Sequence, residues 1–474
     1  MGKGLLSLTS RQTKSIENLL TIPNPAFTKS IRLNLPIRVP PYLHYYWYDN
    51  GDLNFPIGAT SDVLAVLGDG WKVNDLRNEK ALECEYSLNF DLWDFQEKAL
   101  KELEDKTLGV IESPTGSGKS FLMLKLIEQK KQNTIILVDT YELANQFKAR
   151  FSDINKKTGK PLTSLKAEDV GYVGEGKKIW KPITVALLQT MRNLSEEEME
   201  YVNTNFGMVL CDEAHILPAN TFFRALNRLN IKYKYGFSGT AFRDDGLTDV
   251  IFWCAGPKVV TIPPEDTGGR MLKPELEIVK SNFDWPLIQT SDYTYMISDL
   301  SINAERNNLI VNHYKAGHEN SEKQTVFLCT LRTQVYELWR LLGKTGGVLI
   351  SPLGDDIKAK LKEELHLSDE EIKEFGEFGR KKSRVNIING LKDGSINTVV
   401  TTYKLFNKGI DISTLTLLYF CGPTRSRTIV LQSRGRIVRK LANKHPRIIH
   451  IWDDKINLLK NQGYAVHRLI RQGL

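Results

Sequence analysis

From about residue 91 onward, short apolar runs alternate with amphipathic helical segments, and this alternation constrains the fold more than any other feature of the sequence. The runs LGVIES, TIILVDT and ITVALLQT are each followed by a helical pattern. The alternation breaks over residues 256–300, where proline and glycine are frequent, and it resumes from residue 301 to the end. Because parallel strands need long crossover connections, usually helices, the pattern predicts two α/β domains with parallel sheets.

Length and composition agree with several globular domains. The chain has 474 residues, more than one hydrophobic core usually serves, and its hydrophobic fraction of 41% and charged fraction of 25% are close to those of soluble proteins. These values exclude a largely disordered, collagenous or membrane protein, and no apolar run approaches the ~20 residues of a membrane helix. We expect an accessory module over residues 1–85, a first domain over 86–255, a linker over 256–300 and a second domain over 301–474. Short alternating apolar stretches predict a small, β-leaning N-terminal module.

The five cysteines are scattered, without a CxxC pair or a histidine at zinc-ligand spacing. This distribution makes disulfide and zinc frameworks improbable and suits a reducing compartment. The first residues, MGKGLLSLTSRQTKS, are too polar for a signal peptide. We therefore expect a cytoplasmic protein.

Residues 108–126, LGVIESPTGSGKSFLMLKL, place a glycine-rich loop between an apolar strand and an amphipathic helix. In such a loop Gly116 and Gly118 let the backbone approach phosphate oxygens, Lys119 reaches the β- and γ-phosphates, and Ser120 binds magnesium. Ser113 stands where the usual pattern has glycine. A loop with chance glycines is the alternative, which the strand–loop–helix setting disfavours. The residues expected to bind ATP here are Ser113, Pro114, Thr115, Gly116, Ser117, Gly118, Lys119 and Ser120.

Two adjacent carboxylates follow another apolar run. GMVLC is followed by Asp212, Glu213, Ala214 and His215, at the expected carboxyl end of a parallel strand, where ligands bind. We expect Asp212 to hold magnesium, and Glu213 to orient and deprotonate the attacking water. A solvated surface pair is the alternative, but such a pair seldom follows a buried strand.

Further motifs accompany these two in a fixed order, and together they resemble the motifs of the superfamily 2 helicases with a DEAH-type second motif. The resemblance runs from residue 92 to residue 439. It implies two RecA-like domains that bind ATP and magnesium in the cleft between them. The matching pieces are LWDFQ, SPTGSGKS, ILVDTYELANQ, VALLQT, DEAH, FSGT, TVFLCT, VVTTYKLFNKGID and QSRGRIVR.

In the first domain the resemblance assigns roles on both sides of the phosphate loop. Gln96 resembles the glutamine that reads the adenine edge, although Trp93 stands where related enzymes often have arginine. Arg243, Asp244 and Asp245 resemble the Arg-Glu-Asp triplet of some DNA-repair helicases. The motif that links the ATP state to domain closure corresponds to Ser238, Gly239 and Thr240.

In the second domain the resemblance points to two arginines. Arg436 and Arg439 are three residues apart, so we expect them on one side of a helix, facing the γ-phosphate as arginine fingers. A solvated basic helix is the alternative, which neither Gln432 nor Gly435 would favour. The fifth motif corresponds to Thr402, Gly409 and Asp411, and the sixth to Gln432, Gly435, Arg436 and Arg439, with Gly409, Asp411 and Gln432 expected at the ATP site.

Basic residues cluster where a nucleic acid could bind. The net charge is only +8, but residues 425–450 contain eight Lys or Arg and no acidic residue. The aromatic cluster of residues 42–48 could stack on unpaired bases, although packing in a core is the favoured reading. The resemblance places the contacts to one DNA strand at Thr140, Leu143, Gln146, Gln189, Thr190, Thr330 and Thr402.

The C-terminal third, SRTIVLQSRGRIVRK followed by IIHIWDD, is similar to bacteriophage UvsW-type branch-migration helicases, as is NAERNNLI. This similarity implies a phage-type DNA helicase, of the kind that phage T5 encodes, which unwinds and branch-migrates forked or four-way DNA in recombination, repair and fork processing. The N-terminal module would then recognise DNA structure.

Two other functions share the same motifs. An RNA helicase has every ATPase motif, and a non-catalytic clamp would use ATP only as a conformational ligand. The clamp predicts a defect at Lys119, Glu213, Arg436 or Arg439, and all four are present. We expect branched or forked DNA as the partner, no membrane contact and a monomeric protein, and the sequence predicts no protein partner. For the charged stretch 355–384 we favour a solvated face.

Overall fold

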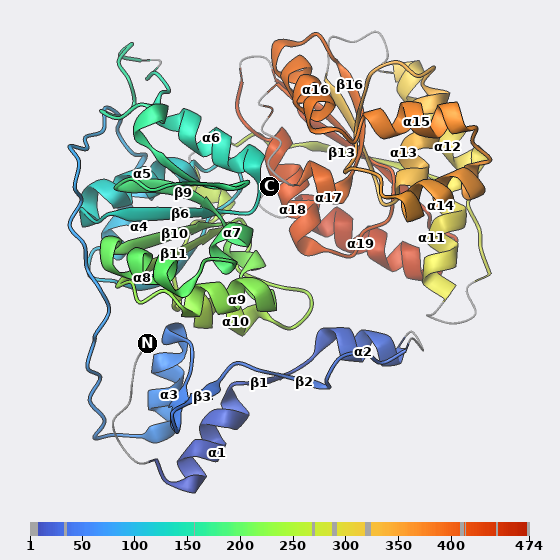
Figure 1. The fold of residues 1–474 in the computed structure, drawn as a ribbon. Helices are drawn as coiled ribbons and strands as arrows, with labels where there is room; N and C mark the ends of the chain where they lie inside the picture. The colour runs from blue at the N-terminus through green and yellow to red at the C-terminus, as the bar shows by residue number, and fades with distance from the viewer. Residues whose placement is uncertain are drawn as a thin grey trace. The chain divides into compact units, whose positions relative to one another are not determined.

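The computed structural model describes residues 8–32, 36–155, 157–267, 271–286, 292–317, 324–407, 412, 414–441 and 444–471. The chain divides into two compact units, residues 1–266 and 267–474 (Figure 1). Each unit contains one large sheet with helices, so the prediction of two parallel-sheet domains is confirmed. None of the described helices is both long and apolar enough to cross a membrane.

The sheet of the first unit has the strand order β12-β5-β11-β10-β6-β9-β7-β8, and all neighbours are parallel except β7 and β8. Asp212 pairs with Phe237, and Ser238 pairs with Glu112, so β10, β11 and β5 end at one edge. The strands are β5 (Leu108–Glu112), β6 (Thr134–Val138), β7 (Gly171–Gly174), β8 (Lys177–Ile179), β9 (Ile183–Leu187), β10 (Met208–Asp212), β11 (Tyr233–Ser238) and β12 (Lys258–Thr261).

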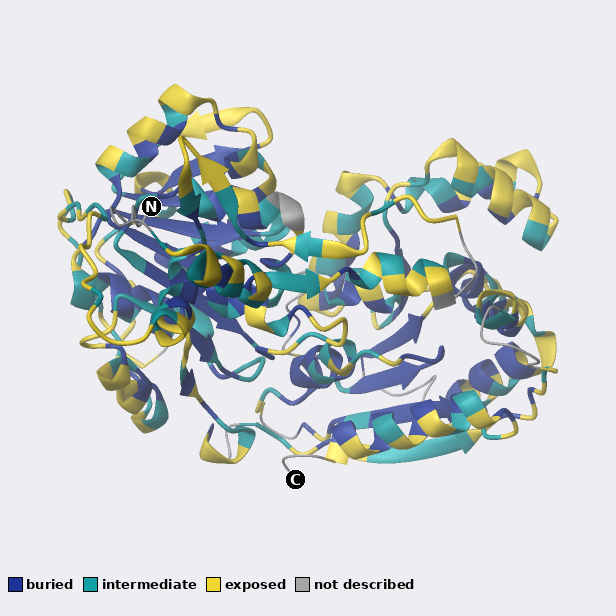
Figure 2. Cartoon of the chain, turned by 90° about the horizontal axis from the view of Figure 1, so that it is seen from below, coloured by how far each residue is buried: buried dark blue, intermediate teal, exposed yellow. Residues whose placement is uncertain are grey.

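The central strands of this sheet are buried along their length, because helices cover them (Figure 2). Such strands read as continuous apolar runs, which is why TIILV and MVLC were recognisable in the sequence. The helices of this part are α4 (Asp94–Glu102), α5 (Lys119–Lys130), α6 (Tyr141–Phe151), α7 (Leu188–Arg192), α8 (Glu196–Asn205), α9 (Asn220–Asn227) and α10 (Thr248–Ala255), with short 3₁₀ turns η2 (Ala167–Asp169) and η3 (Ala214–Ile216).

The N-terminal segment contains two small antiparallel sheets, β1 with β2 and β3 with β4, as the alternating pattern predicts. Its described residues also form the helices α1, α2 and α3, which the sequence analysis did not predict, because helices of eight to ten residues are too short to show a clear helical periodicity. The elements are α1 (Ser10–Leu19), β1 (Thr21–Pro23), α2 (Pro25–Arg32), β2 (Tyr42–His44), β3 (Trp47–Asp49), β4 (Asp52–Asn54), η1 (Ile57–Ala59) and α3 (Thr60–Leu67).

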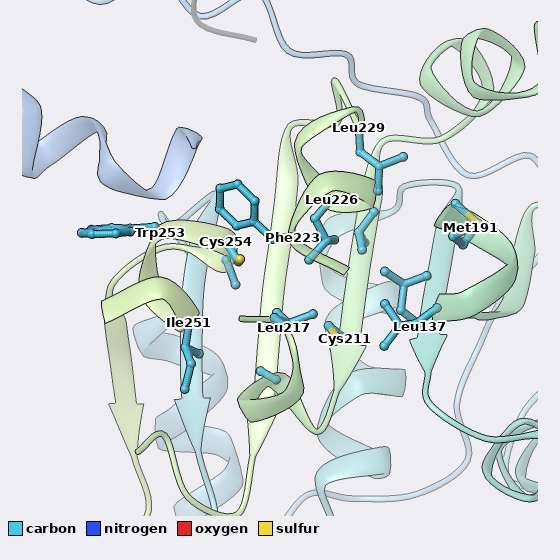
Figure 3. Packing of buried hydrophobic residues seen from close by; sticks show 14 of the residues in the cluster. Leu137, Met191, Cys211, Leu217, Phe223, Leu226, Leu229, Ile251, Trp253 and Cys254 are labelled. Atoms are coloured by element: carbon cyan, nitrogen blue, oxygen red, sulfur yellow. The ribbon is translucent and has the colours of Figure 1, made fainter. Parts of the chain in front are cut away.

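This segment belongs to the first unit, and its buried residues, Tyr45 among them, pack into the same core as Phe223 and Trp253. The Tyr45 ring packs edge-on against Phe223, with the ring centres 4.8 Å apart, and its centre lies 5.5 Å from that of Trp253. Phe223 and Trp253 belong to the core shown in Figure 3. A Cβ at Gly58 would lie 2.1 Å from the Phe252 carbonyl oxygen, so glycine permits this close approach. Core packing is thus the role of Tyr45, whereas Tyr42 and Tyr48 are about half exposed.

The second unit contains a fully parallel sheet with the order β13-β18-β17-β14-β16-β15. Residues 256–300, expected as a linker, contribute β12 to the first sheet and β13 to the second, and the prolines and glycines around these two short strands obscured them in the sequence. The strands are β13 (Glu275–Lys280), β14 (Thr325–Cys329), β15 (Gly347–Leu349), β16 (Thr398–Thr402), β17 (Leu417–Phe420) and β18 (Arg447–Trp452).

The charged stretch 355–384 folds as helices whose outer faces are exposed, while Leu361, Ile372 and Phe375 are buried. The predicted solvated face therefore exists, but it belongs to amphipathic helices that cover a core. The helices of the second unit are α11 (Tyr293–Ile302), α12 (Ala304–Gly317), α13 (Arg332–Leu341), α14 (Asp355–Leu365), α15 (Asp369–Glu377), α16 (Lys381–Asp393), α17 (Tyr403–Phe406), α18 (Arg427–Ile437) and α19 (Asn457–Arg471).

Candidate functional site

Three neighbouring strands of the first sheet deliver the predicted ATP-site residues to one edge. β5 leads into the glycine-rich loop, β11 ends at Ser238, and β10 ends at Asp212. Since β11 lies between the other two, the loop and the carboxylates flank residues 238–240. The parallel register therefore brings together segments that are about a hundred residues apart in the sequence.

The glycine-rich loop has the backbone that a phosphate cradle needs. Gly116 and Gly118 have φ values of 94° and 81°, in the left-handed region that favours glycine. Gly118 caps α5, whose N-terminus attracts negative charge. Lys119 Nζ donates to the Ser113 carbonyl oxygen at 3.3 Å, so the lysine folds back over the loop.

Gln96 binds this loop from α4. Its Nε2 donates to the carbonyl oxygens of Ser117 at 2.8 Å and Gly118 at 3.3 Å, while its Oε1 accepts from the Trp93 backbone N–H at 3.0 Å. The side chain is 3% exposed. Gln96 therefore braces the phosphate loop, and adenine reading by this residue stays a prediction.

The two carboxylates at the end of β10 lie in a partly buried, charged setting. Desolvation raises the pKa of Asp212 to about 6, the Glu213 carboxylate acts in the same direction, and Lys119 opposes it. Glu213 has a φ of 56°, a strained conformation for a residue other than glycine, and its N–H donates to Asp212 Oδ1 at 3.1 Å. A divalent cation beside Asp212 would relieve this crowding of negative charge.

A chain of contacts joins the carboxylates to the end of β11. His215 Nδ1 lies 3.3 Å from Glu213 Oε2 and 3.2 Å from Ser238 Oγ. Ser238 Oγ donates to the Thr240 carbonyl oxygen at 2.6 Å. Arg243 donates to the His215 carbonyl oxygen at 2.6 Å and pairs with Asp245 at 2.5 Å. The predicted coupling residues Ser238 and Arg243 thus connect to Glu213 through His215.

The glycine-rich loop and the residues at the ends of β10 and β11 have the space and the oxygen ligands to bind ATP and magnesium. A Cβ at Gly239 would lie 3.3 Å from Thr115 Oγ1 and 3.8 Å from Lys119 Nζ, so the glycine keeps the loop open toward β11. Among the residues that the structure describes, no group of three or more His, Cys, Asp or Glu could hold a metal alone. Magnesium uses one or two protein oxygens together with phosphates; Ser120 and Asp212 would supply them.

The first-unit residues predicted to contact DNA follow β6 and β9 at the same edge. Thr140 caps α6, where its hydroxyl accepts from the Leu143 N–H at 3.3 Å, and Gln146 lies on that helix. Gln189 Nε2 donates to the backbone and side-chain oxygens of Asp139 at 2.9 Å. Thr190 lies beside Gln189 on α7. The structure therefore groups these residues, and their contact with DNA stays a prediction.

In the second unit, Thr330 and Thr402 lie at the carboxyl ends of adjacent parallel strands, β14 and β16. Thr330 Oγ1 donates to the Pro423 carbonyl oxygen at 3.0 Å. Gly409 and Asp411 lie outside the described residues. The two threonines therefore lie at the same edge of the sheet. Their contact with the phosphate backbone of one DNA strand stays a prediction.

The predicted pair of arginines is not on one helix, and that expectation is wrong. Arg436 is on α18, buried, donating to the Asn407 carbonyl oxygen at 2.9 Å, with its guanidinium 5.6 Å from the Phe406 ring centre. Arg439 lies beyond the end of α18 and forms a β-bridge with Met271. Gln432 and Gly435 are also buried on α18.

Arg439 nevertheless lies in a cationic setting. Burial lowers the pKa of Lys444 to about 8, and Arg439 acts in the same direction.

Two residues of the site were not predicted from the sequence. His215 bridges Glu213 and Ser238, and its place within DEAH was the available signal. Asn407 organises α18, since its Oδ1 accepts from Ser433 Oγ at 3.0 Å and its carbonyl oxygen accepts from Arg436. Nothing in the sequence around Asn407 indicated this role.

Two family models match the chain. Residues 89–243 match the family described as "Type III restriction enzyme, res subunit", and residues 304–440 match the "Helicase conserved C-terminal domain". The matches follow one another in the order of the two sheets. Together they support a superfamily 2 helicase with ATP-hydrolysing motor domains.

Curated relatives include the DNA 3'-5' translocase XPB2 of Sulfurisphaera tokodaii, 23% identical over 452 residues, which cover 87% of this chain and 94% of that protein. The putative DNA 3'-5' helicase Rad25 of Halobacterium salinarum is 28% identical over 211 residues, 44% of this chain. That match spans only 34% of the Halobacterium protein.

Among solved structures, Saccharomyces cerevisiae Dbp5 bound to RNA and ADP BeF3 is 14% identical with a TM-score of 0.54, covering 80% of this chain and 88% of that one. This similarity shows the fold. The T4 UvsW structure covers 94% of this chain and 87% of its own, at 16% identity and a TM-score of 0.38. That likeness does not establish the UvsW type, and a phage T5 origin has no support among the matches.

Proposed function

We propose that this chain, which carries both motor domains of a superfamily 2 helicase, is an ATP-driven DNA translocase that unwinds branched DNA. The observation that carries the proposal is the sheet edge where the glycine-rich loop, residues 238–240 and the DEAH carboxylates meet on β5, β11 and β10. Their contacts link a phosphate cradle to a candidate general base.

The residues at this sheet edge divide between binding the nucleotide and activating water. Lys119 Nζ and the loop N–H groups hold phosphate oxygens, while Ser120 and Asp212 hold magnesium, which neutralises phosphate charge when bound. A Glu213 carboxylate oxygen orients the attacking water and accepts its proton. His215 Nδ1 lies 3.3 Å from Glu213 Oε2 and also contacts Ser238 Oγ, so a shift of the Glu213 carboxylate would move the group that contacts Ser238.

DNA is the favoured substrate because the two relatives above are described as a DNA 3'-5' translocase and a putative DNA 3'-5' helicase. Because both descriptions specify the 3'-5' direction, we propose that this chain also moves from 3' to 5' along the DNA strand that it binds. The proposal that the chain also branch-migrates DNA rests on the similarity of SRTIVLQSRGRIVRK to UvsW-type helicases. The five free cysteines suit the reducing interior where such a substrate occurs.

The test is strand separation on a matched set of substrates. We expect activity on forked, three-way and four-way DNA above that on linear duplex, measured by release of a labelled strand at one ATP concentration. Equal, negligible unwinding of all DNA substrates would contradict the proposal. Stronger stimulation of ATP turnover by single-stranded RNA than by DNA would favour the RNA helicase.

A further inference from the structure

A groove runs along the outer edge of the second sheet, between β13, the end of β18 and the outer side of α19. It has a volume of about 540 Å³, within the range of small-ligand pockets. None of its residues belongs to the predicted ATP site or strand contacts. The residues that line it are Ile278, Trp452, Tyr464, His467, Arg468 and Arg471.

The floor of the groove is closely packed and uncharged. A Cβ at Gly463 would lie 2.1 Å from Trp452 Nε1, so glycine lets α19 pack directly on the indole, which donates to the Lys460 carbonyl oxygen at 3.3 Å. His467 Nε2 lies 2.8 Å from His450 Nδ1. Burial lowers the pKa of His467 to about 4, with Arg471 acting in the same direction, so the ring is neutral at pH 7.

One wall of the groove offers an aromatic ring to solvent. Tyr464 is 53% exposed, and its ring packs edge-on against Trp452 with the ring centres 5.1 Å apart. This edge contact holds the phenol ring while leaving ring surface exposed. An aromatic side chain held in this way is a stacking platform for a base.

The rim of the groove is cationic. Arg468 and Arg471 are exposed, one turn apart on α19, and neither forms an ion pair with any residue that the structure describes. Helix α19 contains no acidic residue. Lys280 lies 5.2 Å from the Trp452 ring centre, and its charge is matched by Asp454 at 2.7 Å. The unmatched charge at the rim is therefore that of the two arginines.

We infer that this groove binds a single strand of DNA, with one base stacked on Tyr464 and the neighbouring phosphates held by Arg468 and Arg471. Guanidinium groups pair well with phosphate oxygens, and a neutral apolar floor accepts the base without an unpaired charge. An acidic peptide would use the arginines but would gain little from the aromatic wall. The inference rests on the proposed function, since it takes DNA as the substrate.

Replacing Tyr464 tests the stacking contact. Fluorescence anisotropy with labelled oligo(dT) should give a Kd about ten-fold weaker for Tyr464→Ala than for the wild type. Tyr464→Phe should restore the wild-type Kd, because phenylalanine keeps the stacking face. Tyr295→Ala is the matched control, since Tyr295 is a 72% exposed tyrosine on α11 of the same unit.

Replacing both arginines tests the phosphate contacts. The double variant Arg468→Ala/Arg471→Ala should make the negative slope of log K against log salt shallower by about 1.4, since each phosphate contact to a single strand contributes about −0.7. The double variant Lys315→Ala/Lys373→Ala removes two exposed cations elsewhere in the unit and should leave the slope unchanged.

The outcomes separate this inference from the proposed function. If DNA stimulates ATP turnover and Tyr464→Ala binds oligo(dT) as tightly as the wild type, the groove inference is wrong while the proposed function stands. If oligo(dT) does not bind the wild type, the groove inference is wrong, and the unwinding assay on forked DNA decides the proposed function separately.

Discussion

Replacing Glu213 with glutamine is expected to lower ATP turnover by a factor of about 10²–10⁴, the usual contribution of a general base. The amide has nearly the shape of the carboxylate but cannot accept a proton from water. The phosphate loop, Lys119 and Asp212 remain, so the variant should still bind ATP and DNA and stall on the complex. Steady-state phosphate release and equilibrium binding of a fluorescent ATP analogue measure the two properties separately.

Glu112→Gln is the matched control for this substitution. Glu112 ends β5 at the same sheet edge, but its carboxylate pairs with Lys258 and accepts from the Ala241 N–H, so a glutamine there should keep most of the turnover. Substantial hydrolysis by Glu213→Gln would remove Glu213 from the role of base. A loss of ATP binding would instead assign the residue to the nucleotide pocket.

Replacing Arg439 with alanine is expected to lower ATP turnover by a factor of ~10³ or more if the residue acts as an arginine finger. Its position beyond the end of α18, near Lys444, leaves the helix intact when the side chain is removed. The melting temperature should therefore stay close to that of the wild type. Lys440→Ala, at the exposed neighbouring position, is the control and should keep its turnover.

Arg436→Ala should combine a loss of turnover with a loss of stability. Arg436 is buried, bonded to the Asn407 carbonyl oxygen and packed on Phe406, so its removal should cost about 2 kcal/mol or more of unfolding free energy. Chemical denaturation and ATP turnover on the same samples separate the two effects. Normal turnover by either arginine variant would exclude that arginine as a finger.

The sequence alone could predict the position of the candidate ATP site because parallel strands fix which segments meet. A buried strand reads as an apolar run, and the polar residues that follow such runs must gather at the carboxyl edge. LGVIE and MVLC were therefore enough to bring Lys119 and Asp212 to one edge, whereas the position of Ser238 was expected from the family resemblance alone. Neither the hydrogen bonds of Gln96 to the loop nor the bridging role of His215 follows from that rule, since both depend on side-chain geometry.

Other features could not be predicted, for identifiable physical reasons. The helices α1 and α2 are only ten and eight residues long, so their periodicity is weak in a segment rich in turn residues. Strand β13 follows a Pro- and Gly-rich stretch that resembles a linker, and only pairing with β18 reveals it. The i,i+3 spacing of Arg436 and Arg439 indicated one helix, but the helix ends between them.

Stimulation of ATP hydrolysis by DNA tests the central claim most directly. We expect single-stranded and forked DNA to raise the phosphate release rate of the wild-type chain several-fold, and Lys119→Ala to show no hydrolysis with or without DNA, because the lysine that reaches the phosphates is absent. A wild-type rate that DNA does not change, or a Lys119→Ala rate equal to that of the wild type, would contradict the account.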